Sequence, residues 1–240
     1  VQMLENLPDT LRKAWLLGDW DIFLGQYFTM WDRSIHIIRP FILPEHWRRY
    51  VAFDYGRDML AVFWIAVDER GKAYVYKELY KAGLIVSAAA KVIIEMTDES
   101  IDTYYAPPDL WNKHSDTGKS TADIFAEQGI CLVMAKNDRI SGWRDLAEWL
   151  QPHDDEQGQR TADLLIFENC FNLIRTLPAL QYDDKNPNDC AKEPHELTHA
   201  PDALRYFVAG RPRRTSLPVV HDEDYIDYDT QIDDFLNFGR

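Results

Sequence analysis

The fold is decided by residues 50–67, which read YVAFDYGRDMLAVFWIAV. The first seven of these residues have the composition of a short strand that ends at a glycine, and residues 59–67 form a continuous apolar run of strand type. Residues 68–71 predict a hairpin turn, and residues 73–80 alternate in polarity as a third strand does. The stretch and its continuation therefore predict three consecutive antiparallel strands.

Beyond residue 80 the pattern alternates between helix and strand. Helices are predicted at 84–96, 121–128, 142–150, 169–177 and 202–210, and strands at 101–106, 130–135 and 162–167. Three strands in a meander followed by alternating elements predict an α/β fold, a mixed sheet with helices on both faces.

The chain divides into three predicted parts. Residues 1–45 contain a helix near residues 11–17 and a polar, aromatic connector, residues 46–210 form the α/β domain, and residues 211–240 form a tail that begins basic and ends acidic. The sequence begins at Val1 within a helical pattern, so we expect a piece of a longer protein.

Composition limits the class of protein. The 240 residues are 46% hydrophobic, which suffices for one large core. Three widely spaced cysteines predict neither a disulfide framework nor a zinc ribbon, and they suit an intracellular setting. No apolar run approaches the roughly 18 residues of a membrane helix. The net charge of −14 opposes binding to nucleic acid, although seven of the 40 acids lie in the tail.

Residues 195–199 read HELTH and match the HExxH signature of zinc proteases. The signature works when one continuous helix places both histidines on the same side, with the glutamate as general base. Here Pro194 precedes the motif and Pro201 follows it closely, which predicts a helix boundary near Ala200. The sequence therefore disfavours zinc proteolysis.

Three aspartates offer a different metal chemistry. Asp54 ends the first strand, Asp109 directly follows the fourth, and Asp202 lies in the first turn of the last helix, after Pro201. If the two strands are neighbours, their backbones lie about 4.8 Å apart and the carboxylates converge. Ligation by oxygen alone favours Mg²⁺ or Mn²⁺, and two such ions about 4 Å apart hydrolyse phosphodiesters. Each acid also has a purely structural explanation, as a turn, a cap or a helix-dipole partner.

The ordered set of motifs resembles the nuclease domain of phage and prophage terminase large subunits, which belongs to the ribonuclease H-like, retroviral-integrase superfamily. The resemblance covers roughly residues 10–210 and rests on the following segments: 18–21 (GDWD), 53–56 (FDYG), 106–109 (APPD), 137–139 (NDR), 174–180 (IRTLPAL) and 199–206 (HAPDALRY).

The resemblance implies a metal-dependent endonuclease that cuts double-stranded DNA with little sequence specificity during viral genome packaging. It makes Asp54, Asp109 and Asp202 the ligands of two Mg²⁺ or Mn²⁺ ions, with His199 as a nearby catalytic histidine. It also implies that residues 1–45 link to an ATPase domain outside this chain, that the partners are the portal and the small terminase subunit, and that the protein acts in the host cytoplasm.

Residues 116–120 (DTGKS) resemble the end of a phosphate-binding loop, but Lys113 stands where the full pattern needs its first glycine. We therefore expect no ATP site in this chain, and expect Thr117 or Ser120 to cap the following helix. The basic residues that we expect to contact DNA phosphates are Lys119, Lys136, Arg139 and Arg205.

Two other functions stay open at the level of sequence. A zinc metallohydrolase would need His195 and His199 together, whereas a Mg²⁺ or Mn²⁺ nuclease needs only the aspartates. A non-catalytic module of the packaging motor would keep the fold without cutting DNA.

Overall fold

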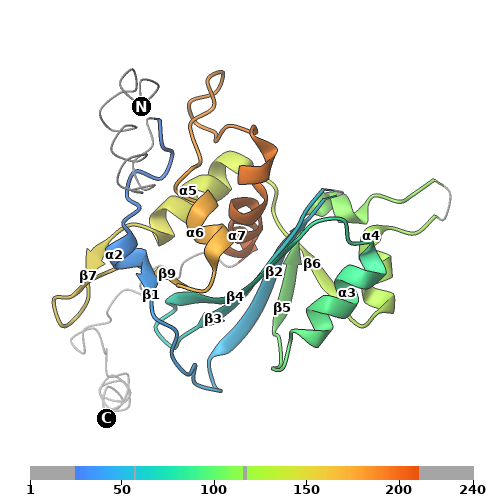
Figure 1. The fold of residues 1–240 in the computed structure, drawn as a ribbon, viewed down its shortest axis with the longest axis horizontal. Coiled ribbons are helices and arrows are strands. Elements are labelled where there is room, and N and C mark those ends of the chain that lie inside the picture. Colours follow the sequence, from blue (N-terminus) through green and yellow to red (C-terminus); the bar gives the residue numbers. More distant parts are fainter. Residues whose placement is uncertain (1–24, 57, 116–117, 211–240) are drawn as a thin grey trace, which may run out of the picture.

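The structure is a computed structural model and describes residues 25–56, 58–115 and 118–210. Within these residues one seven-stranded sheet has the order β1-β9-β4-β3-β2-β5-β6, and β7 and β8 form a separate hairpin (Figure 1). The strands are β1 (Ile37–Ile38), β2 (Arg48–Tyr55), β3 (Leu60–Val67), β4 (Ala73–Lys81), β5 (Thr103–Ala106), β6 (Leu132–Met134), β7 (His153–Asp154), β8 (Arg160–Thr161) and β9 (Leu164–Phe167).

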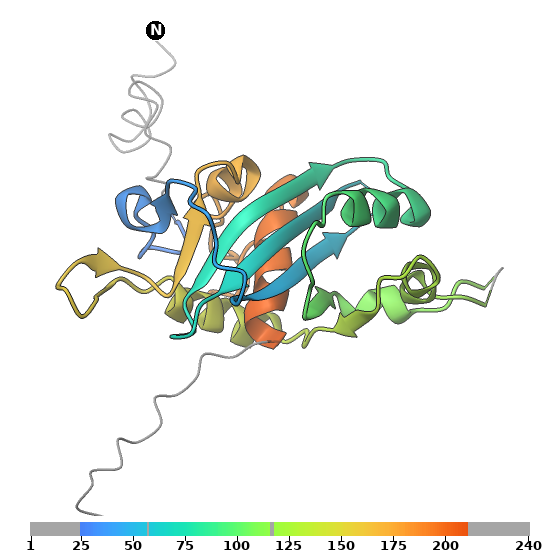
Figure 2. The same cartoon turned by 90° about the horizontal axis from the view of Figure 1, so that it is seen from below.

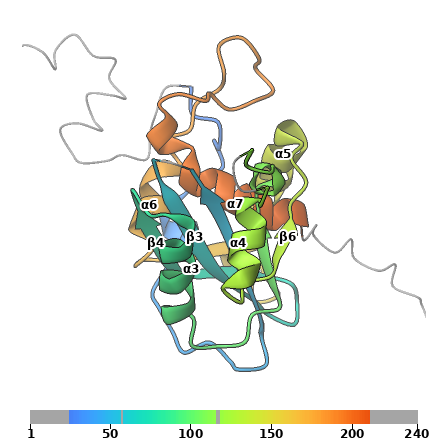
Figure 3. The same ribbon diagram turned by 90° about the vertical axis from the view of Figure 1, so that its right-hand side faces the viewer.

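Helices cover both faces of the sheet, as Figures 1 and 3 show. They are α2 (Arg33–His36), α3 (Val86–Glu95), α4 (Thr121–Glu127), α5 (Arg139–Trp149), α6 (Phe171–Thr176) and α7 (His199–Gly210), with 3-10 turns η1 (Pro108–Trp111) and η2 (His195–Leu197). One face carries α5, α6 and α7, and the other carries α3 and α4. The predicted α/β fold is confirmed.

Strands β2, β3 and β4 form the predicted antiparallel meander. The chain then crosses the sheet through α3 and returns as β5, which pairs with β2 in parallel. A parallel neighbour requires such a crossover, because a short hairpin can only join antiparallel strands. Strand β2 therefore lies between β3 and β5, in the interior of the sheet.

The two-residue period of β2 assigns its side chains to opposite faces. Tyr50 and Ala52 belong to the core under α5, α6 and α7, whereas Val51 and Phe53 belong to the core under α3 and α4. Asp54 continues the series of Tyr50 and Ala52, so the alternation directs its side chain to the α7 face. Helix α7 packs across β2 and β3 on that face (Figure 2).

Local capping explains where two of the helices begin. Ser120 caps α4, accepting from the N–H of Asp123 while the Asp123 side chain accepts from the N–H of Ser120. This confirms one of the two predicted caps. Asp138 caps α5 through the N–H of Ser141, so α5 begins at Arg139, three residues before the predicted start at Gly142.

Residues 25–45 contribute to both the sheet and the core. Strand β1 pairs in parallel with β9, and Phe28 and Trp31 are buried in the core under α5–α7. Residues 25–45 thus pack against elements that follow residue 46, and the division at residue 46 stays a prediction. The segment carries no helical or strand period, so only its tertiary partners reveal its burial.

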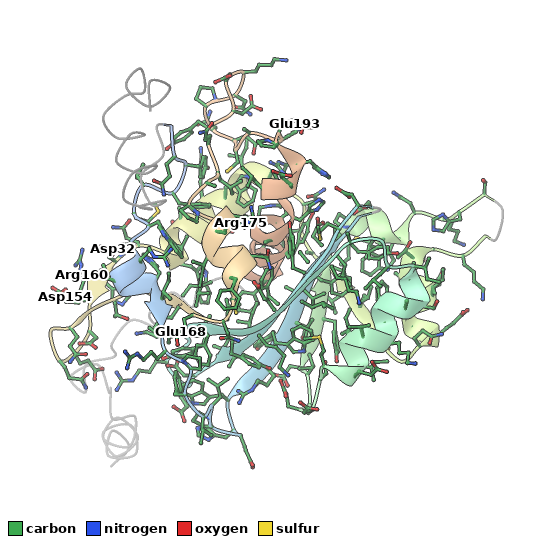
Figure 4. The ribbon with its side chains drawn as sticks, viewed as in Figure 1. Asp32, Asp154, Arg160, Glu168, Arg175 and Glu193 are labelled. Atoms are coloured by element: carbon green, nitrogen blue, oxygen red, sulfur yellow. The ribbon has the colours of Figure 1, made fainter. Side chains whose placement is uncertain are left out.

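Several sequence predictions fall outside the described residues, namely the helix near 11–17, the GDWD segment and the tail at 211–240. Among the helices that the structure does describe, none is long and apolar enough to cross a bilayer. The hairpin of β7 and β8, which the sequence did not predict, is bridged by Arg160 and Asp154, at 3.3 Å (Figure 4).

Candidate metal centre

Two of the predicted acids lie at one edge of the sheet. Asp54 is the next-to-last residue of β2, and β5 runs parallel to β2 with Ala52 opposite Tyr105. Both strands therefore end at the same edge. The chain leaves β5 through η1, whose first turn contains Asp109, and the Asp109 side chain is exposed. The prediction that the first and fourth strands, β2 and β5, are neighbours is confirmed.

Helix α7 brings the other two predicted residues. It begins at His199, and the N–H of Asp202 donates to the carbonyl of Thr198 at 2.8 Å in its first turn. His199 and Asp202 are three residues apart and so lie on one side of the helix. The buried His199 ring contacts Asp54 directly, with 2.8 Å between Nδ1 and Oδ2.

The electrostatics of Asp54 reflect this convergence. Burial raises the pKa of Asp54, the hydrogen bond with His199 opposes the rise, and the negative charges of Asp202 and Asp109 add to it. Tyr206, one turn along α7, responds to the same groups: burial raises the pKa of its hydroxyl, and the charges of Asp54, Asp202 and Asp109 raise it further. The charges of Asp202 and Asp109 therefore both act on Asp54 and on Tyr206.

Asp202 is held by two arginines that the sequence did not link to it. The Arg205 guanidinium lies 2.7 Å from the Asp202 carboxylate through Nη2 and 2.9 Å through Nε. Arg139, from α5, reaches the same carboxylate at 3.3 Å. The side chain of Arg205 is buried, and Gly142 gives it room, because a Cβ at position 142 would lie 2.8 Å from its Cγ.

Solved structures of phage terminases share this fold, although neither a family model nor a curated protein matches the chain. The large terminase nuclease domain of bacteriophage P22 is similar at a TM-score of 0.60 and 17% identity, over 77% of this chain and 91% of that one. A large terminase from a thermophilic bacteriophage is similar at 0.60 and 19% identity, over 75% of this chain but 44% of that one. The large terminase nuclease of thermophilic phage G20c, in a structure with bound magnesium, is similar at 0.52 and 13% identity, over 78% and 98%.

The chain has the fold of a large terminase nuclease domain. The sequence resemblance and the ribonuclease H-like fold class are thereby confirmed. At these identities the likeness is one of fold, and the chain spans less than half of the thermophilic phage terminase chain.

Within this nuclease fold, the four basic residues predicted at the DNA surface have different environments. Lys136 and Lys119 are exposed, and Lys119 pairs with Glu127 at 2.6 Å. Arg139 is partly buried and also contacts Asp189 at 3.3 Å. Arg205 is only 1% exposed, so it has almost no surface with which to contact a phosphate. Both arginines instead pair with carboxylates of the domain itself.

The HELTH segment does not form one continuous α-helix. His195 opens the 3-10 turn η2, which ends at Leu197, and α7 begins only at His199. The break lies at Thr198, within the motif and two residues before the predicted boundary at Ala200. The geometry that makes HExxH a zinc-protease site is therefore not present in this structure.

The two histidines nevertheless meet at Asp58. Oδ2 of Asp58 lies 2.9 Å from His199 Nε2 and 3.1 Å from His195 Nδ1. Asp58 is exposed and lies in the connection between β2 and β3, where no local sequence pattern marks it as a metal ligand. Its pKa is lowered to about 2: burial opposes the shift, and the hydrogen bonds with His199 and His195 outweigh it. The pKa of the His199 imidazole is raised. Burial lowers it, but the hydrogen bonds with Asp54 and Asp58 raise it by more.

Proposed function

We propose that this chain is a divalent-metal-dependent endonuclease that cuts double-stranded DNA with little sequence preference. The observation that carries the proposal is the contact of His199 with Asp54, at 2.8 Å, at the end of β2, where the charges of Asp109 and Asp202 also act on Asp54, in the fold of terminase nucleases. The raised pKa of Asp54 beside two other carboxylates supports a cation site, because such a cluster is stabilised by positive charge.

The donor set fits Mg²⁺ or Mn²⁺. Asp54, Asp109 and Asp202 supply carboxylate oxygens, which these hard ions prefer, and the related nuclease of phage G20c contains bound magnesium. Two such ions would polarise the phosphodiester, lower the pKa of the attacking water and stabilise the leaving oxygen.

The protein's own contribution is to fix the carboxylates. His199 donates a hydrogen bond from Nδ1 to Asp54, which orients that carboxylate at the end of β2. Arg205 and Arg139 donate to the Asp202 carboxylate and orient it. Asp109 is exposed at the same end of the sheet, so its carboxylate would be open to substrate. A site held in this way needs little rearrangement to bind its ligands.

We further propose a role in viral genome packaging, in the host cytoplasm. The portal and the small terminase subunit would be the partners, with ATP hydrolysis in a domain outside this chain. The terminase fold supports this role. The alternative function, a non-catalytic module of the packaging motor, differs from this proposal in one respect: such a module would not cut DNA.

A plasmid-cleavage assay tests the proposal. We expect the chain to nick and linearise supercoiled DNA with Mg²⁺ or Mn²⁺ and to leave it intact in chelator, because the carboxylates repel one another without a cation. Glu196→Gln is the matched control, since the exposed Glu196 would be essential only to an HExxH hydrolase. It should retain activity within a few fold. Intact plasmid under every metal condition would favour the non-catalytic module.

Lys136 is the strongest candidate for a phosphate contact. Strand β6 runs parallel to β5, with Met134 opposite Ala106, so Lys136 leaves the sheet at the same edge as Asp54 and Asp109. Lys136→Ala should weaken DNA binding for all sequences alike and reduce the slope of log K against log salt by about one. Fluorescence anisotropy at several salt concentrations measures both effects.

Lys91→Ala is the control for that measurement. Lys91 is exposed on α3 and pairs with Glu95 at 3.8 Å, on the other face of the sheet. Its loss should leave the salt slope unchanged. An equal effect of the two variants would mean that general charge, rather than Lys136, governs binding.

A further inference from the structure

We propose that Asp58, His195 and His199 form a zinc site beside the carboxylate centre, with which it shares His199. Their ligand atoms all lie within 4.8 Å of one another. Asp58 Oδ2 is 2.9 Å from His199 Nε2 and 3.1 Å from His195 Nδ1. Ligands of a tetrahedral zinc ion with bonds of about 2.0–2.1 Å lie roughly 3.3 Å apart. The two observed separations thus require little adjustment to receive the ion.

His199 already has the surroundings of a zinc ligand. Its Nε2 faces Asp58, while its Nδ1 lies 2.8 Å from Oδ2 of Asp54. Histidines that bind metal usually donate their second ring nitrogen to a carboxylate, which fixes the tautomer and the ring orientation. In the zinc site, Asp54 would be the carboxylate that accepts from the second ring nitrogen of His199. The two centres share His199, but the zinc ion would use its Nε2 while Asp54 uses its Nδ1.

The backbone places the other two ligands. His195 opens η2, where its N–H donates to Glu193 at 3.1 Å and its carbonyl accepts from the Thr198 hydroxyl at 3.0 Å; Figure 4 labels Glu193 beside this turn. Asp58 comes from the connection between β2 and β3. Gly56 lets that connection fold closely, because a Cβ at position 56 would lie 2.8 Å from Asp58 Oδ1.

The ligand chemistry selects zinc over magnesium. Two imidazoles and one carboxylate suit zinc and similar transition ions, whereas Mg²⁺ prefers oxygen ligands and retains its waters. Asp58 and His195 are exposed, so the ion would keep an open position toward solvent. This site differs from the HExxH site of proteases, because Asp58 is its third ligand and no continuous helix carries the histidines.

Zinc titration of the full chain by calorimetry tests the site. We expect one zinc per chain, with affinity reduced about tenfold or more in both His195→Ala and Asp58→Asn. Both side chains are exposed, and melting temperatures measured in chelator check that the variants fold. Substitution with Co²⁺ should give the strong visible absorption of a low-coordinate ion in the wild type and lose it in both variants.

Three controls separate this site from other zinc ligands. His46→Ala removes an exposed histidine paired with Glu69, and Cys131→Ser removes the exposed thiol; both should bind zinc as the wild type does. Asp109→Asn, which impairs only the carboxylate centre, should also keep zinc affinity. The proposal is overturned if His195→Ala and Asp58→Asn bind zinc normally, or if Asp109→Asn loses as much affinity as they do.

Discussion

We expect Asp54→Asn to abolish the Mn²⁺-dependent nicking of plasmid DNA. The rate of nicking should fall on the order of 100-fold or more. Asparagine keeps the shape of the side chain and can still accept the hydrogen bond from His199. It removes the negative charge that holds the ions. Asp54 carries this role because β2 lies between β3 and β5 and directs the side chain to the α7 face, where His199 and Asp202 lie.

The same substitution should keep or raise the melting temperature in chelator. The wild-type carboxylate is partly buried beside Asp202 and Asp109, which raises its pKa, so the neutral amide relieves repulsion. Thermal melts paired with the nicking assay measure both effects. Asp98→Asn is the matched control: that side chain is 85% exposed and follows α3, so neither property should change. Wild-type cutting by any two of Asp54→Asn, Asp109→Asn and Asp202→Asn would remove the basis of the carboxylate centre.

Arg205→Ala is expected to have the largest effect on stability. The arginine is 1% exposed, and its removal leaves the buried Asp202 without its nearest cation. Breaking a buried ion pair in this way costs about 3–5 kcal/mol. Activity should fall as well, because Asp202 loses the partner that orients it. Urea unfolding in chelator and the nicking assay measure the two losses.

Arg144→Ala provides the comparison for this variant. Arg144 lies on the exposed side of α5, so its loss should change the free energy of unfolding by no more than about 0.5 kcal/mol. If Arg205→Ala unfolded at the wild-type urea concentration, Arg139 would be sufficient to balance Asp202.

The arginine pair also changes what is expected of Asp202→Asn. From the sequence alone, removing any of the three acids relieves repulsion and should preserve stability. In the structure Asp202 balances the buried Arg205, so its neutralisation leaves that cation poorly compensated. Asp202→Asn should therefore lower the melting temperature, whereas Asp54→Asn should not.

The sequence by itself determined the elements whose signals are local. The apolar run of β3, buried along its whole length, and the alternation in β4 predicted the meander. Ser120 was recognisable as a helix cap, and Pro201 placed Asp202 in a first turn. Because strand ends and helix starts have fixed places in an α/β sheet, these patterns also predicted which edge carries Asp54 and Asp109.

Only the tertiary structure decided how separate segments meet. The burial of Phe28 and Trp31 depends on helices that come more than a hundred residues later in the sequence. The ion pair between Arg139 and Asp202 depends on how α5 packs against α7, which no local period encodes. Likewise, Asp58 joins His195 and His199 because the connection after β2 and the turn before α7 reach the same point. Periodicity fixes the face on which a side chain lies, but the partner on that face is set by packing between elements.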